Sequence, residues 1–254
     1  MVRYLSLFLL FFLLLPVFSS GQSTNGEDPP LIPTPQRMEC KANDSRITDF
    51  WVDPAADFAP QTTHLKKLLA ARGLSEVGNS SGADLSISVQ QGVVENSHGF
   101  RGAYSVEIRG ENHMRIVAPD PSGAFYAFQT VRQLIRNKGD RSFLSRCDIH
   151  DWPAFKKRGY MVDVGRNFQS VEQLKQQIDV MANYKMNILH LHLTDNPGWR
   201  LESKIYPELQ SARATSRKPG KYYSQQDFIE LVEYSAERNI TVVPELDIPG
   251  LRLK

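Results

Sequence analysis

Three short apolar runs decide the fold of this chain: Tyr160-Met-Val-Asp-Val164, Asn187-Ile-Leu-His-Leu-His-Leu193 and Thr241-Val-Val-Pro-Glu-Leu246. Helical patterns separate the runs, and strand–helix–strand repetition predicts a parallel sheet with both faces covered. A polar residue follows each run: Arg166, Asp195 and Asp247. If the sheet closes into a barrel, these side chains gather at the mouth where the carboxyl ends of the strands meet, which is where barrel enzymes carry out chemistry.

The intervals between the runs carry helix start signals. Ser170 with Gln173 forms a capping-box pattern, and Leu174, Ile178 and Met181 give the helix that follows a buried face. Ser224 is the expected cap of a second helix that ends near Asn239. A closed barrel needs eight strands and eight helices in about 250 residues. The predicted fold class is therefore α/β, with an incomplete (β/α)8 TIM barrel in residues 151–254.

Residues 31–150 are predicted to form a small α+β domain. A helix around Leu65–Leu69 is expected to stop near Gly73, and residues 85–89 alternate as a half-buried strand does. Residues 104–108 and 114–117 alternate likewise and suggest a hairpin. Ser122 is the expected cap of a helix whose spacing favours core packing over a sugar-stacking platform for its apolar residues, which are Phe125, Tyr126, Phe128, Val131 and Ile135.

The first 30 residues have the composition of a secretory leader and a linker. Arg3 provides the positive start, residues 7–18 are apolar, and small residues follow at 19–21, so residues 1–21 are predicted to be a signal peptide. A membrane anchor is the alternative, but the run is shorter than the ~20 residues a spanning helix needs, so no stable anchor is expected. Residues 22–30 are a polar linker. These features predict a secreted, periplasmic or lysosomal location.

Composition excludes little else. The formal net charge of +2 over 254 residues, with bases scattered among acids, gives no reason to expect a nucleic-acid partner. No metal-ligand cluster is visible in the sequence. Cys40 and Cys147 are the only cysteines. A disulfide between them and two unpaired thiols are equally compatible with the sequence.

Three long motifs around the apolar runs resemble the opening of the catalytic barrel of family 20 glycoside hydrolases, the β-N-acetylhexosaminidases. They are Arg158-Gly-Tyr-Met-Val-Asp-Val-Gly-Arg-Asn-Phe168, Leu189-His-Leu-His-Leu-Thr-Asp-Asn-Pro-Gly-Trp-Arg200 and Val243-Pro-Glu-Leu-Asp-Ile-Pro-Gly250. Residues 102–108 and 122–134 are similar to the non-catalytic domain that precedes this barrel. The resemblance implies an enzyme that removes terminal N-acetylhexosamine from glycans or chitin oligosaccharides, without a metal or organic cofactor.

The family mechanism implied by the resemblance is substrate-assisted and retaining, an exception to the two-carboxylate scheme of most glycosidases. The substrate's acetamido oxygen attacks the anomeric carbon, a glutamate protonates the leaving oxygen, and a neighbouring aspartate orients the acetamido group. That Asp–Glu pair follows a glycine on the fourth strand. The 254 residues contain no Gly-Asp-Glu sequence. No catalytic residue is therefore assigned, the pair is expected beyond residue 254, and this chain is expected to lack hydrolase activity.

Four residues are carried over from the resemblance as substrate-binding candidates. Arg166 matches the arginine that grips hydroxyls of the terminal sugar, and such an arginine needs a carboxylate to hold it. Asp195 and Asp247 match acids at the mouth, and Asp195 is a candidate partner for Arg166. His192 alternates with His190, so the two share a face, and His192 serves either the site or the core. Trp199 fits sugar stacking and packing equally well.

Two departures from the family pattern stand out. Asn196 occupies a position that is often acidic in the family, and Leu251 stands where a histidine is usual, so residues 251–254 are expected not to be family sequence. A frameshift, a splice difference or an incomplete gene would produce such an ending. The alternative function is a non-catalytic secreted glycan-binding or interaction protein derived from the family.

Overall fold

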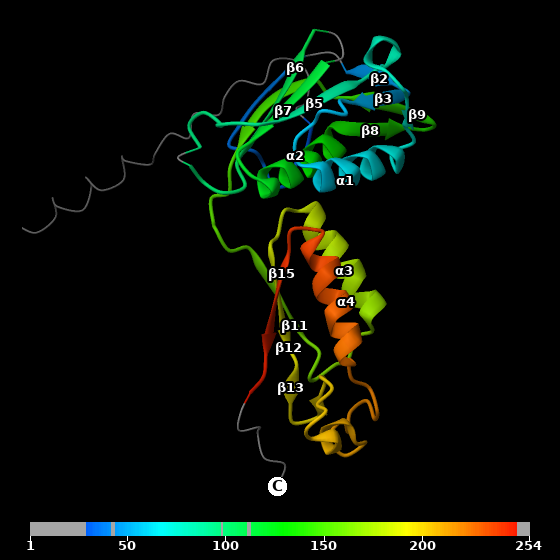
Figure 1. Cartoon of the computed structure of the whole chain (residues 1–254), viewed down its shortest axis with the longest axis vertical. Coiled ribbons are helices and arrows are strands. Elements are labelled where there is room, and N and C mark those ends of the chain that lie inside the picture. The colour runs from blue at the N-terminus through cyan, green and yellow to red at the C-terminus, as the bar shows by residue number, and fades with distance from the viewer. Residues whose placement is uncertain (1–28, 42–43, 98, 111–112, 248–254) are drawn as a thin grey trace, which may run out of the picture.

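The computed structural model describes residues 29–41, 44–97, 99–110 and 113–247 (Figure 1). The predicted signal peptide and residues 22–28 of the predicted linker lie outside this range. Across the described residues the chain is α/β and is divided into an upper unit and a lower unit in Figure 1. None of its described helices combines the length and the apolar character that crossing a membrane requires.

A seven-stranded mixed sheet forms the upper unit, in the order β1-β10-β6-β7-β5-β3-β4. Neighbours from β1 to β7 are antiparallel, and neighbours from β7 to β4 are parallel. The strands are β1 (Arg37–Cys40), β3 (Asp49–Val52), β4 (Ser75–Glu76), β5 (Ser86–Gln91), β6 (Tyr104–Arg109), β7 (His113–Ala118) and β10 (Cys147–Asp151). The expected hairpin is β6–β7, and its turn residues 111–112 lie outside the described range.

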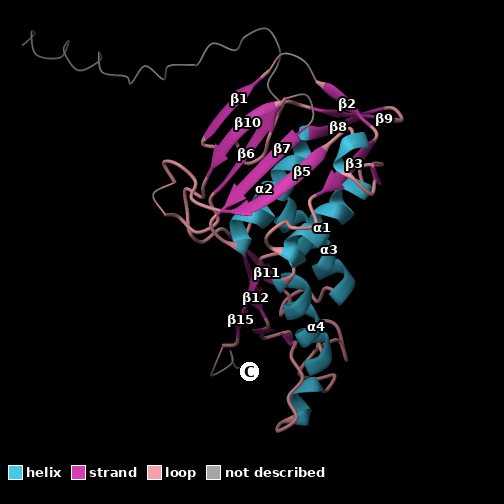
Figure 2. Cartoon of the chain, turned by 45° about the horizontal axis from the view of Figure 1, so that its top comes forward, coloured by secondary structure: helices cyan, strands magenta, loops and turns pink. Residues whose placement is uncertain are grey.

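Two helices cover one face of this sheet (Figure 2). They are α1 (Ala59–Ala70) and α2 (Pro121–Leu134), and a short 3₁₀ helix, η1 (Ser80–Gly82), precedes β5. The core lies between the helices and the sheet, because Leu65, Phe125 and Phe128 are at most 1 % exposed. The prediction that the aromatic cluster of α2 packs in the core is confirmed. A second small sheet, in the order β2-β9-β8, consists of β2 (Ser45–Ile47), β8 (Ile135–Lys138) and β9 (Arg141–Leu144).

The predicted start of α2 was wrong. Its N-cap is Asp120, whose side chain accepts a hydrogen bond from the Gly123 N–H at 3.0 Å, and Pro121 occupies the first turn. Ser122 is already inside the helix, and its hydroxyl instead donates to Asn239 Oδ1 at 2.9 Å. Ile135 is buried as expected, but it begins β8 because the helix ends at Leu134.

The pairing of β1 with β10 at the edge of the upper sheet decides between a disulfide and two free thiols. Cys40 in β1 lies opposite Cys147 in β10, and the two sulfurs form a disulfide across 107 residues of chain. Both cysteines are therefore part of the upper sheet, and no free cysteine remains in the chain.

The lower unit is built on the three apolar runs. They form a parallel sheet in the order β11-β12-β15, and two helices join its strands. The elements are β11 (Gly159–Asp163), α3 (Val171–Asn183), β12 (Ile188–His192), α4 (Gln225–Ala236) and β15 (Thr241–Glu245), with a small hairpin β13 (Thr194–Asp195)–β14 (Gly198–Trp199) and a 3₁₀ helix η2 (Pro207–Gln210) after β12. Ser170 and Ser224 each close a capping box, which confirms both predicted helix starts.

The prediction that both faces of this sheet are covered was wrong for the described residues. Helices α3 and α4 lie side by side along one face (Figure 1), where Leu189 and Leu191 are fully buried. On the other face Met161 is 53 % and Val243 is 41 % exposed. The apolar runs therefore supply one buried face, and the alternate positions carry the open face with the candidate site.

Candidate functional site

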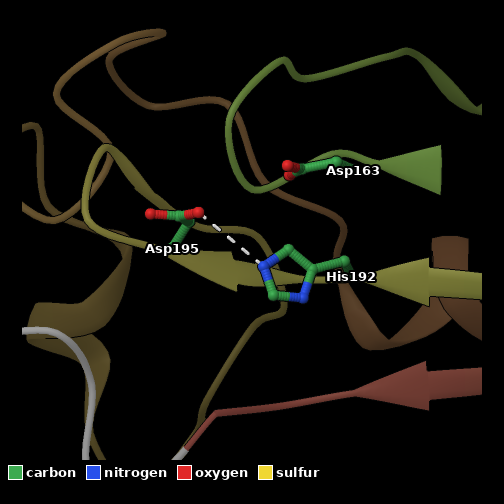
Figure 3. Close-up of side chains that lie close together, drawn as sticks. All are labelled: Asp163, His192 and Asp195. Carbon is green, nitrogen blue, oxygen red and sulfur yellow. Dashed lines mark ion pairs between the residues drawn. The ribbon is translucent and has the colours of Figure 1, made fainter.

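The end of the parallel sheet carries a row of titratable side chains. Asp163, His192 and Glu245 are paired in register and end β11, β12 and β15. Because side chains on neighbouring strands of one row point to the same face, the three project together from the open face. Figure 3 shows Asp163 and His192 directed toward Asp195, which follows β12 in the hairpin. This row is the floor of the candidate site.

Arg166 follows β11 by three residues and is held by two carboxylates. Its backbone N–H donates to Asp163 Oδ1 at 2.9 Å, and its Nε donates to Asp195 Oδ2 at 2.6 Å. The Arg166 side chain is 63 % exposed, whereas that of Asp195 is 6 % exposed. One edge of the guanidinium is therefore fixed by the protein, and the remainder faces solvent. The structure brings together the arginine and the carboxylate that the sequence proposed as partners.

Asp195 is kept ionised by its neighbours. Its limited contact with solvent alone would raise the pKa, but Oδ1 accepts a hydrogen bond from the Asn196 N–H at 2.6 Å and Oδ2 accepts one from Arg166. Together with the positive charge of Arg166, these bonds hold the pKa of Asp195 below its ordinary value. Asn196 thus contributes through its backbone, although its side chain carries no charge.

The two histidines of β12 share one face, as their spacing predicted. His192 Nδ1 lies 3.1 Å from Glu245 Oε1, and His190 Nε2 lies 2.5 Å from Glu245 Oε2. His192 Nε2 also lies 3.8 Å from Asp195 Oδ2, the contact drawn in Figure 3. Desolvation would raise the pKa of Glu245, but the two imidazoles outweigh it and the pKa is lowered. His192 therefore belongs to the polar row and not to the apolar core.

Asp247 completes the group from the third strand. Its backbone N–H donates to Thr194 Oγ1 at 2.8 Å, which ties the segment after β15 to the hairpin after β12. Its carboxylate is exposed and comes within 4.8 Å of the ligand atoms of His192 and Glu245. All four candidates therefore lie at one end of the sheet. Leu251 lies outside the described residues.

The close approach of β11 to the hairpin depends on Gly165. Its N–H donates to the His192 carbonyl at 3.0 Å, and a Cβ added at this glycine would lie 3.1 Å from the Asp195 nitrogen. A side chain here would push apart the backbones that carry Arg166 and Asp195. The glycine thus sets the distance on which the central ion pair depends.

Two overlapping groups in this row have metal-ligand chemistry: Asp163 with His192 and Asp195, and His192 with Glu245 and Asp247. In the first group both carboxylates already contact Arg166, whose charge opposes a second cation. In the second group His192 and Glu245 satisfy each other directly. The Arg166 guanidinium is bound to the protein at Nε and keeps its other N–H donors beside several carboxylates. This arrangement suits hydrogen bonding to neighbouring hydroxyl groups of a sugar.

Sequence reasoning missed three participants. Asp163 was seen only as part of a strand, although an acid three residues before Arg166 on the same strand end was a usable signal. Glu245 was passed over because its relation to the histidines of β12 depends on strand register. Arg200 gave no signal, because its burial depends on a loop more than a dozen residues away. Trp199 is partly buried and donates its indole N–H to the Leu201 carbonyl at 2.5 Å, so that donor is used within the protein.

Two models of one known protein family match most of the chain. Residues 155–252 match the model of the glycosyl hydrolase family 20 catalytic domain, and residues 28–152 match that of domain 2 of the same family. The catalytic-domain match includes residues 251 and 252, so the expectation that this ending is foreign to the family gains no support from it.

Among curated relatives, the N,N'-diacetylchitobiase of Vibrio harveyi is 35 % identical over 242 residues, which are 87 % of this chain and 27 % of the relative. The beta-hexosaminidase of Vibrio furnissii is 38 % identical over 163 residues, which are 59 % of this chain and 26 % of the relative. The chain thus spans only about a quarter of the length of these proteins.

Solved structures agree with this assignment. The family 20 β-N-acetylhexosaminidase of Streptomyces coelicolor superposes with a TM-score of 0.70 at 30 % identity, over 86 % of this chain and 46 % of that one. The Vibrio harveyi exo-β-N-acetylglucosaminidase in complex with N-acetylglucosamine gives a TM-score of 0.72 at 26 % identity, over 91 % of this chain and 38 % of that one. Because two models of one family together match nearly all of residues 28–252, this chain belongs to glycosyl hydrolase family 20.

Proposed function

We propose that the protein is a β-N-acetylhexosaminidase and that this chain supplies the part of it that grips the terminal sugar. The lower unit would be the first three strands and two helices of a (β/α)8 barrel, with domain boundaries at residues 31–150 and 151–254. The parallel order β11-β12-β15, with a helix after each of the first two strands, supports this interpretation. The polar residues lie at the carboxyl ends of the strands, as in other barrel enzymes.

The observation that carries the proposal is the Arg166–Asp195 pair. A guanidinium held at Nε leaves the donors of its other edge to bind neighbouring hydroxyls of a non-reducing-end sugar. Asp195 fixes the arginine, while Asp247 and His192 border the same space and offer further polar groups to the sugar. The motifs that resemble the family nominated these residues, and the geometry brings them to one end of the sheet.

The proposed substrate is a glycan or chitin oligosaccharide that ends in N-acetylhexosamine. Relatives named as hexosaminidases and a chitobiase, and a similar structure that contains N-acetylglucosamine, support this class. Hydrolysis would be substrate-assisted and retaining, and the acid Glu with its Asp partner would come from a fourth strand. The relatives carry the names of hydrolases, so they do not favour the alternative of a non-catalytic glycan-binding protein. A leader in residues 1–21 would direct the protein out of the cytoplasm.

The first prediction is that the chain binds N-acetylglucosamine through Arg166 and does not hydrolyse a chromogenic N-acetylglucosaminide. Arg166→Ala is expected to weaken binding about tenfold or more, because charge-assisted hydrogen bonds contribute roughly 1.5–3 kcal/mol and 1.4 kcal/mol is tenfold. Ligand-observed NMR titration of N-acetylglucosamine measures the affinity, and release of the chromophore measures turnover.

Arg217→Ala is the control, because Arg217 is an exposed residue of the loop after the hairpin. Equal affinity of the wild type, Arg166→Ala and Arg217→Ala would contradict the proposed role of the pair. Turnover that copurifies with the chain would contradict the prediction of inactivity while supporting the family activity.

A further inference from the structure

Arg200 is a charged residue that is fully buried next to the candidate site. Its side chain has no solvent exposure, and its guanidinium stacks on the Phe168 ring with 5.8 Å to the ring centroid. Within the described residues, every hydrogen bond that this guanidinium makes ends on a backbone carbonyl. Burying a charged guanidinium costs free energy unless its N–H donors are hydrogen-bonded. The carbonyl partners of Arg200 offset this desolvation cost.

The acceptors come from three separate segments of the chain. Nε donates to Val164 O at 3.0 Å, and Nη2 donates to Gly165 O at 3.1 Å, at the end of the first strand. Nη2 also reaches Pro197 O of the hairpin at 3.5 Å. Nη1 donates to the loop beyond it, at Lys221 O (2.8 Å) and Lys218 O (3.4 Å).

These segments are the ones that carry the central ion pair. Val164 and Gly165 directly precede Arg166, and Pro197 follows Asp195 by two residues. The backbone N–H of Arg200 also donates to the Leu193 carbonyl at 3.0 Å, at the point where the hairpin leaves β12. The guanidinium therefore binds the backbone beside both partners of the pair, without a hydrogen bond to either side chain.

The geometry requires arginine at this position. A planar fork with five donors can serve carbonyls on three sides, whereas a lysine ammonium has three donors at one point. Gly198 leaves the space for the fork, because a Cβ at Gly198 would lie 2.3 Å from Arg200 Cζ. The sequence Gly198-Trp-Arg200 thus encodes both the buried charge and the room for it.

We propose that Arg200 is a positioning residue for the sugar-binding pair: it holds the end of the first strand against the hairpin so that Arg166 and Asp195 meet in register. The proposal rests on the proposed function of that pair as the sugar-gripping group. Loss of the fork is expected to free the Val164–Gly165 carbonyls, let the two backbones separate and loosen the ion pair.

The test compares wild type, Arg200→Lys and Gly198→Ala, the last of which keeps the arginine and displaces its guanidinium. The pKa of Asp195 is measured from the pH dependence of its carboxyl ¹³C signal, and the affinity for N-acetylglucosamine is measured by NMR titration. In both variants the pKa of Asp195 is expected to rise toward its ordinary value of about 3.9, and the affinity is expected to fall about tenfold, in line with one weakened charge-assisted bond.

Arg217→Lys is the matched control, since it makes the same substitution at an exposed site of the same loop. An unchanged Asp195 pKa in either variant that keeps its native spectrum would overturn the proposal, since a general loss of stability does not by itself shift a carboxyl pKa. If the Asp195 pKa shifts in the variants but no form binds the sugar, the positioning role stands and the proposed function fails.

Discussion

At the scale of single residues, Asp195 is the group on which the site depends. It lies almost entirely out of solvent, accepts hydrogen bonds from Arg166 and from the Asn196 N–H, and sits 3.8 Å from His192. These contacts stabilise the carboxylate form more than water does. The exposed Arg166 side chain is held in one position because its partner Asp195 is buried. An ion pair between two exposed side chains would contribute little to stability.

Asp195→Asn is expected to lower the free energy of unfolding at pH 7 by about 1.5–3 kcal/mol, the range for hydrogen bonds to charged groups. The folded-state pKa lies below the unfolded value, so the folded chain binds fewer protons between the two. The contribution of Asp195 is therefore fully present above about pH 4 and disappears as the pH falls through the folded pKa.

Urea unfolding of wild type and Asp195→Asn from pH 7 to pH 3 measures this difference. The gap between the two proteins is expected to begin to narrow as the pH falls below about 4. Asp140→Asn, a substitution at an exposed turn, serves as the control and is expected to change stability by less than about 0.5 kcal/mol. A gap that stays constant with pH would show that the Asp195 charge is not the source of the stabilisation.

At the scale of elements, the site exists because β11 and the β13–β14 hairpin approach within backbone contact. Strand register places Asp163, His192 and Glu245 in one row, and the hairpin then folds Asp195 back over that row. Gly165 permits the approach, and the buried fork of Arg200 maintains it. The helices α3 and α4 contribute indirectly, since they cover the other face of the sheet.

Gly165→Ala is expected to destabilise the chain by about 1–3 kcal/mol, the usual range for an inserted methyl in a packed region. The new Cβ would lie 3.1–3.2 Å from atoms of Thr194 and Asp195, and these are mostly backbone atoms that cannot rotate away. Chemical denaturation measures the loss. At Gly78 an added Cβ meets nothing within 4 Å, so Gly78→Ala is the control, and equal effects at both glycines would refute the close-approach argument.

At the scale of the whole molecule, the two units are joined by a buried polar network. Lys185, after α3, extends its ammonium to Asp151 Oδ2 at 3.0 Å and to the Tyr104 hydroxyl at 2.6 Å. Tyr104 in turn contacts Thr130 Oγ1 at 2.6 Å, inside the upper unit. Burial lowers the pKa of Lys185, and the Asp151 carboxylate offsets part of this effect. The upper unit, which carries no candidate site residue, is thus attached to the lower unit through the buried Lys185–Asp151 ion pair.

Lys185→Met is expected to destabilise the protein by about 3–5 kcal/mol, because it leaves the Asp151 carboxylate buried without its cation. Replacing both partners, as in Lys185→Met with Asp151→Asn, is expected to cost less than the sum of the single changes. Thermal unfolding followed by circular dichroism measures each variant.

Lys175→Met is the comparison, since the Glu230 partner of Lys175 is exposed, and a loss of about 0–1 kcal/mol is expected there. If Lys185→Met and Lys175→Met cost the same, the network does not hold the units together.

The sequence by itself located part of the elements, whereas it carried no prediction for β1–β4, β8–β10 or the β13–β14 hairpin. Period-2 and period-3.6 patterns located the three parallel strands, both capped helices of the lower unit and the β6–β7 hairpin, because these depend on contacts between near neighbours in the chain. The long motifs indicated the family and nominated Arg166, Asp195, Asp247 and His192. The start of α2 was misplaced because Asp120 and Ser122 are both good caps, and only the position of the preceding strand selects between them.

Only the tertiary structure decided the rest. Pairing of Cys40 with Cys147, the roles of Asp163 and Glu245, and the burial of Arg200 and Lys185 all depend on which backbones meet across gaps in the sequence. Which face of the parallel sheet is covered also depends on where the helices α3 and α4 pack. Register and long-range packing are properties of several segments at once, and no local pattern records them.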